Sequence, residues 1–336
     1  MLAKKNWMEA EVRDIMITLK SSASHYKFGL AAFLFLAPAL TFFSIYVIIP
    51  IFQSLQLSLF EWNGLYNSDG VSTATFVGLD NYRKLWVDPN FWISLKNNFL
   101  WLLLYLLAVP LGLMVALFLN QTVMGIRVYK SLFFFPFVIS QVVVGFIFGW
   151  FYNPDFGIVA KLWQFIFCEE TINFIGNKTF KCARSVPDIL SSADYATYGI
   201  IFAGLWPQVA YCVILYLTGL NNVAADQVEA GRLDGAKGWR MLWFIILPQL
   251  KPATFIAIAV TIIGALRSFD MIAVMTQGGP YGMTNVLSHY MYEVALSEYG
   301  DRYGYGSAVA TILFGIMMVF ITYFLWSMYQ DERRDS

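Results

Sequence analysis

Long apolar runs recur along the chain, separated by shorter polar stretches. Six runs have about 20 residues, the length that a helix needs to cross a bilayer core about 30 Å thick. They extend approximately over 28–50, 100–119, 131–152, 198–220, 254–272 and 307–329. A helix pairs its own backbone N–H and C=O groups, for which lipid offers no partners. The pattern therefore predicts an all-α, polytopic membrane protein with six transmembrane helices in a permease domain over 28–329.

The Lys and Arg residues indicate which ends of these helices are cytoplasmic. If the N-terminus is inside, thirteen of the 22 Lys and Arg lie in inner segments and eight in outer segments, and Arg267 lies within the fifth run. Inner loops of membrane proteins carry an excess of these residues. The distribution predicts that the N- and C-termini are both cytoplasmic, with a short cytoplasmic tail over 330–336.

Two segments outside the apolar runs have patterns of their own. Residues 1–27 carry apolar positions at helical spacing with charges between them, which predicts a cytoplasmic or interfacial helix; a frayed tail is the alternative. Residues 153–196 form a polar outer insertion. Its Cys168 and Cys182 either form a disulfide or remain two thiols, because their separation in space is not fixed by the sequence.

The composition agrees with a membrane protein and excludes several other classes. Apolar residues make up 58% and charged residues 13%, against about 25% charged in soluble domains, and mean hydropathy is +0.59. Tryptophans near the ends of the runs, such as Trp101, fit interfacial belts. A net charge of zero provides no basic field for nucleic acid. Three Cys and two His are too few for a disulfide scaffold or a His-rich metal site.

The loop over 221–252, between the fourth and fifth runs, carries more local signals than a connection needs. Glu229 and Leu233 fit a short polar helix. Asp234-Gly235 is a strong turn signal because Gly tolerates a positive φ, and an apolar helix resumes after it. The loop is therefore predicted to be a helix, a turn and a second helix that present a polar surface to a cytoplasmic partner.

This loop resembles the signature of the permease subunits of ABC importers, which reads Glu-Ala-Ala, three residues, Gly, nine residues, Ile-x-Leu-Pro. The chain has Glu229-Ala230-Gly231, then Gly235, and nine residues later Ile245-Ile246-Leu247-Pro248. It departs from the signature at Gly231, where the family has Ala, and this Gly is expected to loosen the helix by about 1 kcal/mol. Pro248 is expected to end the second helix where the fifth run begins.

Two further motifs are similar to the carbohydrate-uptake branch of this family, and specifically to the F-type subunit of maltose permeases. They are Gly-Leu-Asp-Asn-Tyr over 78–82 and Met-Thr-Gln-Gly-Gly-Pro over 275–280. The resemblance implies a type I importer permease fold in the bacterial inner membrane. It also implies three kinds of partner besides lipid: a second homologous permease, two ATP-binding-cassette ATPase subunits, and an extracytoplasmic sugar-binding protein.

The resemblance also implies a role for the loop in coupling to the ATPases, and the residues expected to carry this role are Glu229, Ala230, Gly231, Asp234, Gly235, Ala236, Leu247 and Pro248. A solvated helix charge is the alternative reading of Glu229, and an ordinary turn that of Asp234. The chain contains no Gly-x-x-x-x-Gly-Lys-Ser/Thr phosphate loop. We therefore expect no cofactor in this chain, with Mg-ATP bound and hydrolysed on the partner ATPases.

Polar residues within the fourth and fifth runs are candidates for a substrate pathway, because such groups are costly in lipid. These residues are Gln208, Tyr211, Thr261 and Ser268. Their side chains suit sugar hydroxyls and C–H faces, and similar permeases contact substrate through these two spans; hydrogen bonding between helices is the alternative role. Arg267 and Asp270, three residues apart, are expected to pair on one face of the fifth helix in the outer leaflet.

The favoured function is therefore a permease subunit that translocates a sugar, an oligosaccharide or glycoside such as an α-glucoside, delivered by the binding protein. A membrane-embedded enzyme is the second hypothesis, but the runs offer only Arg267 and Asp270 as ionisable groups. We therefore expect no catalytic or metal-binding residues. A channel or scaffold that works without an ATPase is the third hypothesis, and flux without ATP would distinguish it.

Overall fold

The structure is a computed structural model, and it describes residues 33–67, 69, 71–121, 124–172, 178–182, 185–297 and 301–335. The helix predicted within 1–27 lies outside the described residues. The chain divides into two compact units, Met1–Gln56 and Leu57–Ser336.

The described part of the first unit belongs to one apolar helix, Phe33–Leu57. This helix contains a π-helical turn, η1 (Ser44–Ile48), and continues as α2 (Ile49–Leu57). The apolar run predicted an end at Pro50, but the helix continues past it. Proline cannot donate a backbone hydrogen bond, and the wider turn directly before it accommodates this loss without ending the helix.

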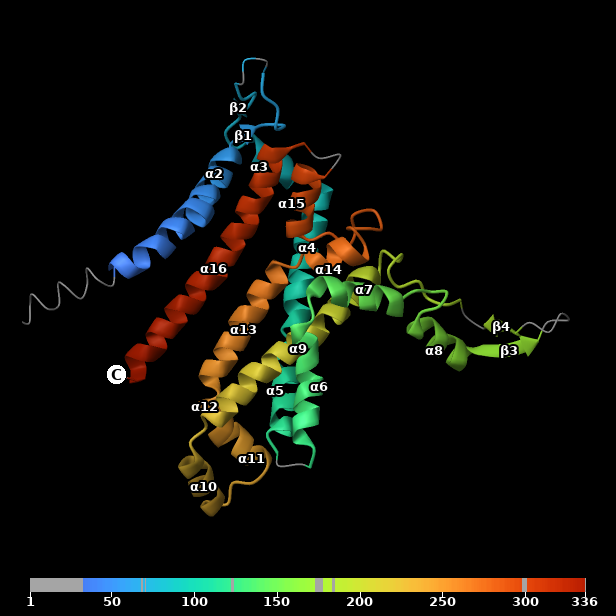
Figure 1. The fold of residues 1–336 in the computed structure, drawn as a ribbon, viewed down its shortest axis with the longest axis vertical. Helices are drawn as coiled ribbons and strands as arrows, with labels where there is room; N and C mark the ends of the chain where they lie inside the picture. The colour runs from blue at the N-terminus through green and yellow to red at the C-terminus, as the bar shows by residue number, and fades with distance from the viewer. Residues whose placement is uncertain are drawn as a thin grey trace, which may run out of the picture. The chain divides into compact units, whose positions relative to one another are not determined.

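Three long helical segments form the framework of the second unit (Figure 1). They are α4 (Pro89–Tyr105) with its continuation α5 (Ala108–Leu119), α9 (Ala196–Asn221) and α16 (Tyr303–Asp335). Helix α16 continues through most of the predicted tail. Among the described residues of the whole chain, four helices are long and apolar enough to cross a membrane, or up to six if two bent pairs each count as one span.

The first bent pair replaces the straight helix that was predicted over 131–152. Helices α6 (Ile126–Val138) and α7 (Gln141–Phe151) meet at an angle of 100°. Ile139 is extended, and the Ser140 hydroxyl accepts a hydrogen bond from the Val143 backbone N–H at 3.4 Å, so Ser140 caps a new helix. A serine cap between two apolar helices therefore breaks this run.

The second bent pair begins in the loop over 221–252. Helix α10 (Ala225–Leu233) precedes a three-part helix that turns by 72° into α13 (Lys251–Leu266), and its parts are α11 (Trp239–Met241), η2 (Leu242–Ile246) and α12 (Leu247–Gln249). The second helix ends at Gln249, one residue past Pro248 and just before α13, close to the end that was expected at Pro248. As at Pro50, a π-helical turn lies directly before the proline.

The fifth helix is also shorter than predicted at its other end. Helix α13 ends at Leu266, and a separate short helix, α14 (Asp270–Met275), follows a break. Arg267 and Asp270 therefore do not share a helix face, and the structure places no ion pair between these two described residues. The expected pairing is wrong because it assumed a continuous helix.

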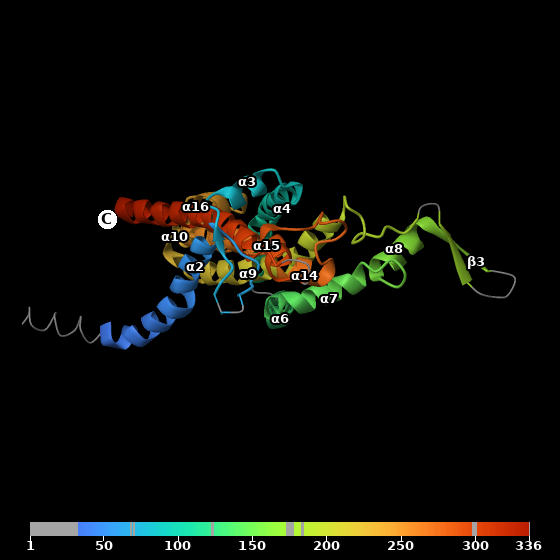
Figure 2. The same cartoon turned by 90° about the horizontal axis from the view of Figure 1, so that it is seen from above.

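Two short antiparallel hairpins depart from the predicted all-α fold. Strands β1 (Phe60–Glu61) and β2 (Thr75–Phe76) precede α3 (Asp80–Trp86). In the outer insertion, α8 (Ile158–Phe167) leads into β3 (Cys168–Ile172) and β4 (Lys178–Cys182), which extend away from the helices in both views (Figures 1 and 2). Cys168 lies opposite Cys182 in this ladder and is disulfide-bonded, whereas Cys212 is a free, buried thiol.

Asp88 joins three helices at one end of the second unit. It caps α4 by accepting a hydrogen bond from the Asn90 backbone N–H at 2.9 Å. Its carboxylate also accepts hydrogen bonds from the hydroxyls of Tyr290, in α15 (Leu287–Leu296), and Tyr305, in α16. Burial raises the pKa of Asp88, but these hydrogen bonds outweigh burial and hold the pKa below its ordinary value.

Helix α5 packs closely against α9, because Gly112 has no side chain to hold the two backbones apart. A Cβ atom added at Gly112 would lie 2.4 Å from the Cys212 Cβ and 3.1 Å from its backbone carbonyl carbon. The two helices are therefore in contact almost backbone to backbone, as small residues permit in membrane proteins.

We expect Gly112→Ala to destabilise the protein by about 1–3 kcal/mol, because the added methyl group meets backbone that cannot move alone. The control is Gly315→Ala in α16, where an added Cβ has no neighbour within 4 Å. Thermal unfolding of the purified variants measures the difference. Equal midpoints for the two variants would show that α5 and α9 do not pack as closely as described.

Candidate functional site

A cavity of about 510 Å³ lies among α4, α6, α7, α9, α13 and α14. We call it the central cavity. Its lining residues are Trp101, Tyr105, Phe137, Ile139, Ser140, Gln141, Pro207, Gln208, Tyr211, Val260, Ile263, Gly264, Arg267, Ser268, Phe269, Asp270 and Met271.

Two helix breaks in the second unit open into the central cavity. Residues 139–141 contribute the junction of α6 and α7, and residues 267–270 contribute the break between α13 and α14. Backbone that leaves the helix has polar groups without helical partners, and at membrane depth such backbone is tolerated where it lines a polar cavity. The breaks therefore mark the position where a polar ligand can be accommodated.

Three of the four predicted pathway residues line the central cavity, namely Gln208, Tyr211 and Ser268. Thr261 does not line it. The Thr261 side chain is fully buried, and its hydroxyl accepts a hydrogen bond from Gln208 Nε2 at 2.9 Å and lies 3.8 Å from Cys212 Sγ. Thr261 thus joins α13 to α9 and orients Gln208, which was the alternative role considered for it.

The cavity wall also carries two polar atoms that the sequence did not single out. Among the described residues, four buried side-chain atoms have no hydrogen-bond partner, and two of them, Trp101 Nε1 and Gln141 Oε1, belong to lining residues. A buried unpaired donor or acceptor costs about 1–3 kcal/mol, so this pair provides a reason to bind a ligand hydroxyl. Gln141 directly follows the capping Ser140, and this serine was the feature of the sequence that could have indicated a helix break at Gln141.

Trp101 does not belong to an interfacial belt. Helix α4 begins at Pro89, so Trp101 lies well inside it, and only 1% of the residue is exposed. Its ring packs against Tyr105 with the centroids 5.0 Å apart. The sequence pattern placed Trp101 at a span end because the apolar run begins later than the helix does.

The charged residues Arg267 and Asp270 lie on the same wall. They were expected to form a structural pair away from any substrate. Because the helix break separates them and no ion pair joins them, each contributes its charge to the cavity separately. A ligand that enters therefore meets a cation and an anion as well as amide, hydroxyl and aromatic groups.

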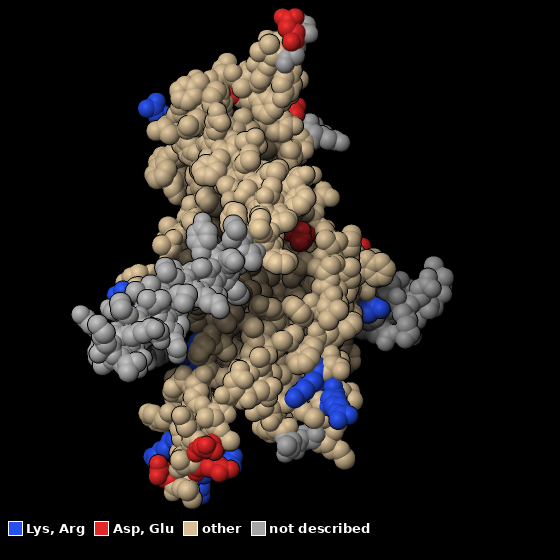
Figure 3. Space-filling view, turned by 60° about the vertical axis from the view of Figure 1, so that its left-hand side comes forward, with Lys and Arg blue, Asp and Glu red and all other residues tan. Residues whose placement is uncertain are grey.

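The loop over 221–252 forms a second exposed site at the opposite end of the second unit from β1 and β2 (Figure 1). Helix α10 carries exposed Glu229 and Leu233, and 89% of Leu233 is accessible. The turn after it forms as predicted, with Gly235 at a φ of +81°. Charged side chains of both signs gather at this lower end in Figure 3.

Two contacts within the loop join its first part to the helix that follows α10. The Gln249 side chain accepts a hydrogen bond from the Ala224 backbone N–H at 2.9 Å. Gly231 is buried against the following helix, and a Cβ there would lie 2.0 Å from Ile245 Cδ1. Gly231 was expected to loosen α10, but the structure shows that glycine provides the space for this packing.

The comparisons with known proteins identify the family. Residues 108–333 match the family described as "binding-protein-dependent transport system inner membrane component". A probable ABC transporter permease protein of Pyrococcus horikoshii is 33% identical, with 90% of this chain and 96% of that protein aligned. The multiple sugar-binding transport system permease protein MsmF of Streptococcus mutans is 32% identical over 80% of this chain and 84% of its own length.

Solved structures show the same fold. A chain of a bacterial ABC transporter involved in the import of the acidic polysaccharide alginate superposes with a TM-score of 0.72 and 20% identity, covering 91% of this chain and 96% of that one. Among the relatives by sequence, the lactose transport system permease protein LacF of Rhizobium radiobacter is 28% identical over 94% of this chain and 99% of its own length. The chain thus belongs to the family of binding-protein-dependent transport system inner membrane components and is a permease subunit of an ABC transporter, not an enzyme.

Proposed function

We propose that this chain is a permease subunit of an ATP-driven importer and that the central cavity receives the saccharide cargo. The observation that carries the proposal is the meeting of two helix breaks at one cavity, where Trp101 Nε1 and Gln141 Oε1 are unpaired. A saccharide offers hydroxyls to such atoms and C–H faces to aromatic rings. Gln208 and Tyr211 on the same wall supply an amide and a ring.

The proposed cargo is an oligosaccharide or glycoside, of which an α-glucoside is one form. Support comes from the relatives, whose names include lactose transport and multiple-sugar transport. The proposed assembly contains a second homologous permease, two ATPase subunits that bind Mg-ATP, and an extracytoplasmic sugar-binding protein. In this proposal the chain crosses the bacterial inner membrane six times with both termini in the cytoplasm, which places α10 inside.

Helix α10 is proposed to dock on an ATPase subunit. Glu229 and Leu233, one turn apart, place an exposed carboxylate beside an exposed apolar side chain. A large apolar side chain that is exposed to solvent next to a charged one is typical of a surface that binds a partner protein. Helix α13 then connects this surface to the central cavity, because it begins next to the loop and ends at the cavity wall.

We expect Glu229→Ala to reduce ATP-driven saccharide uptake at least about tenfold while the complex remains assembled, because a single buried interface residue can contribute 2 kcal/mol or more. The control is Gln227→Ala, an exposed residue on the opposite face of α10. Uptake is measured in proteoliposomes that contain the complete transporter. Normal uptake by the Glu229 variant would contradict the docking role, and uptake without ATP would favour a channel.

We expect Gln141→Leu to weaken saccharide transport about tenfold to a hundredfold without lowering the thermal midpoint, because Gln141 Oε1 has no partner in the protein to lose. For a deoxy-sugar that lacks the contacted hydroxyl, the difference in transport between the variant and the wild type should be smaller. Uptake of a series of deoxy-sugars, together with thermal unfolding, measures both effects.

The matched control for this experiment is Tyr216→Phe, which removes a hydroxyl that donates to Thr254 Oγ1 at 3.1 Å between α9 and α13, outside the cavity lining. This variant should lower the thermal midpoint and leave substrate preference unchanged. If Gln141→Leu behaved in the same way, Gln141 would be a structural residue and not a substrate contact.

A further inference from the structure

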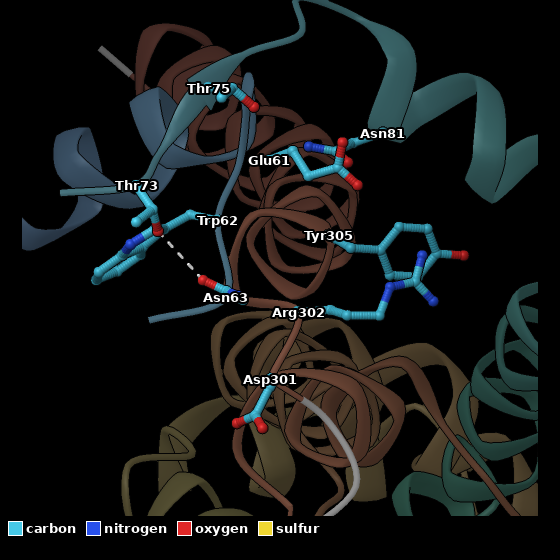
Figure 4. Close-up of a pocket in the computed structure, with 9 residues that line it drawn as sticks. All are labelled: Glu61, Trp62, Asn63, Thr73, Thr75, Asn81, Asp301, Arg302 and Tyr305. Carbon is cyan, nitrogen blue, oxygen red and sulfur yellow. Dashed lines mark hydrogen bonds between the residues drawn. The ribbon is translucent and has the colours of Figure 1, made fainter. Parts of the chain in front are cut away.

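A second pocket, of about 360 Å³, lies between the β1 region and the start of α16. We call it the β1–α16 pocket, and it shares no lining residue with the central cavity. It lies at the end of the second unit opposite α10 (Figure 1). Figure 4 shows Trp62 and Asn63 on one side of it, Arg302 and Tyr305 on the other, and Glu61 between them.

The aromatic side of the pocket is held in place by packing. Trp62 Nε1 donates a hydrogen bond to the Leu65 carbonyl at 3.1 Å. Its ring lies 5.4 Å from the Tyr303 ring and 5.8 Å from the Tyr66 ring, measured between centroids. Because these contacts fix the indole before any ligand arrives, binding does not have to restrict it.

The opposite side presents an oriented cation. The Arg302 guanidinium lies 4.0 Å above the centroid of the Tyr305 ring, and the Tyr305 hydroxyl is itself bound to Asp88 at 2.5 Å. Among the described residues, no acidic group forms an ion pair with Arg302. Its planar set of N–H donors is therefore positioned and available.

Further donors and acceptors in the pocket are also unused. The Asn63 side-chain oxygen accepts bonds from the Leu65 N–H at 3.2 Å and the Thr73 hydroxyl at 3.3 Å, which leaves its amide N–H groups for a ligand. Asp301, at a φ of +49°, has no hydrogen bond or ion pair with another described side chain. The pocket thus combines planar amide, carboxylate and guanidinium groups with an immobilised indole.

We propose that the β1–α16 pocket is a second saccharide-binding site, which takes a neutral mono- or disaccharide unit. Adjacent hydroxyls of a sugar match planar side chains that offer or accept two hydrogen bonds, and a sugar's C–H face packs on an aromatic ring. Asp301 offsets the charge of Arg302, and Glu61 is paired with Lys84 at 3.5 Å, so an anionic ligand gains no net attraction. The volume lies within the range of about 300–1,000 Å³ that small-molecule pockets have.

The observations favour a saccharide over a protein segment. Seven of the nine residues that line the pocket have polar or charged side chains, and the site is concave, whereas a protein interface has an apolar centre. The inference does not require that the central cavity takes the same ligand. One experiment can therefore contradict the proposal for one site without contradicting the proposal for the other.

The test uses the complete transporter in lipid nanodiscs, without ATP and without the binding protein. Lactose and maltotriose are the probes, and saturation-transfer-difference NMR detects their binding. We expect Trp62→Ala and Arg302→Met each to weaken the affinity of the β1–α16 pocket about tenfold, and so to remove its part of the signal, because each removes one side of the site. Arg302→Met leaves the packing around Trp62 intact, so it answers the question even if Trp62→Ala does not fold.

Two control variants separate the β1–α16 pocket from the rest of the chain. Trp86→Ala removes another exposed tryptophan, outside both cavities, and should keep the signal. Gln141→Leu alters only the central cavity and should keep the part of the signal that Arg302→Met removes.

Three results would overturn the proposal. They are full binding by both pocket variants, loss of binding only in Gln141→Leu, and no binding of either probe to the wild type. The second result would leave the proposed function of the central cavity intact.

Discussion

Backbone hydrogen bonding is the constraint on which the rest of this structure depends. In lipid an unpaired N–H or C=O is costly, so a chain keeps its helices intact except where another polar environment exists. In the second unit, α6 gives way to α7 at Ile139, and α13 gives way to α14 after Leu266. Both breaks open into one cavity, where Trp101 and Gln141 have unpaired polar atoms. The fold thus concentrates its unsatisfied groups where a polar cargo would pass.

The helices around the cavity are held together by contacts that leave it open. Gly112 allows α5 to approach α9, and Thr261 binds Gln208 from behind the cavity wall. On the cytoplasmic side of the proposed topology, Gly231 seats α10 against the helix that leads into α13. Helix α10 therefore packs on a helix that bends by 72° into α13, and α13 ends at the wall proposed to meet the cargo. Packed helices of this kind can move both sites together.

Local signals were sufficient for the turn in the loop, but not for the site. Asp234-Gly235 forms the expected turn because the signal depends on two adjacent residues. The breaks at Ser140 and Leu266 were missed because hydropathy averages over a window and ignores one capping serine. Thr261 and Trp101 were misplaced for a different reason: only the packing of α4, α9 and α13 decides which side of a helix faces the cavity. The predicted pairing of Arg267 with Asp270 was wrong because it assumed that the fifth helix continues without a break past Leu266.

The most direct measurement is a structure of the complete transporter with a saccharide bound. The account predicts density for the sugar between the α6–α7 junction and the α13–α14 break, within hydrogen-bonding distance of Gln141 Oε1 or Trp101 Nε1. A saccharide that reaches the membrane region but contacts neither break, or a central cavity that stays empty while cargo is held between other helices, would contradict it.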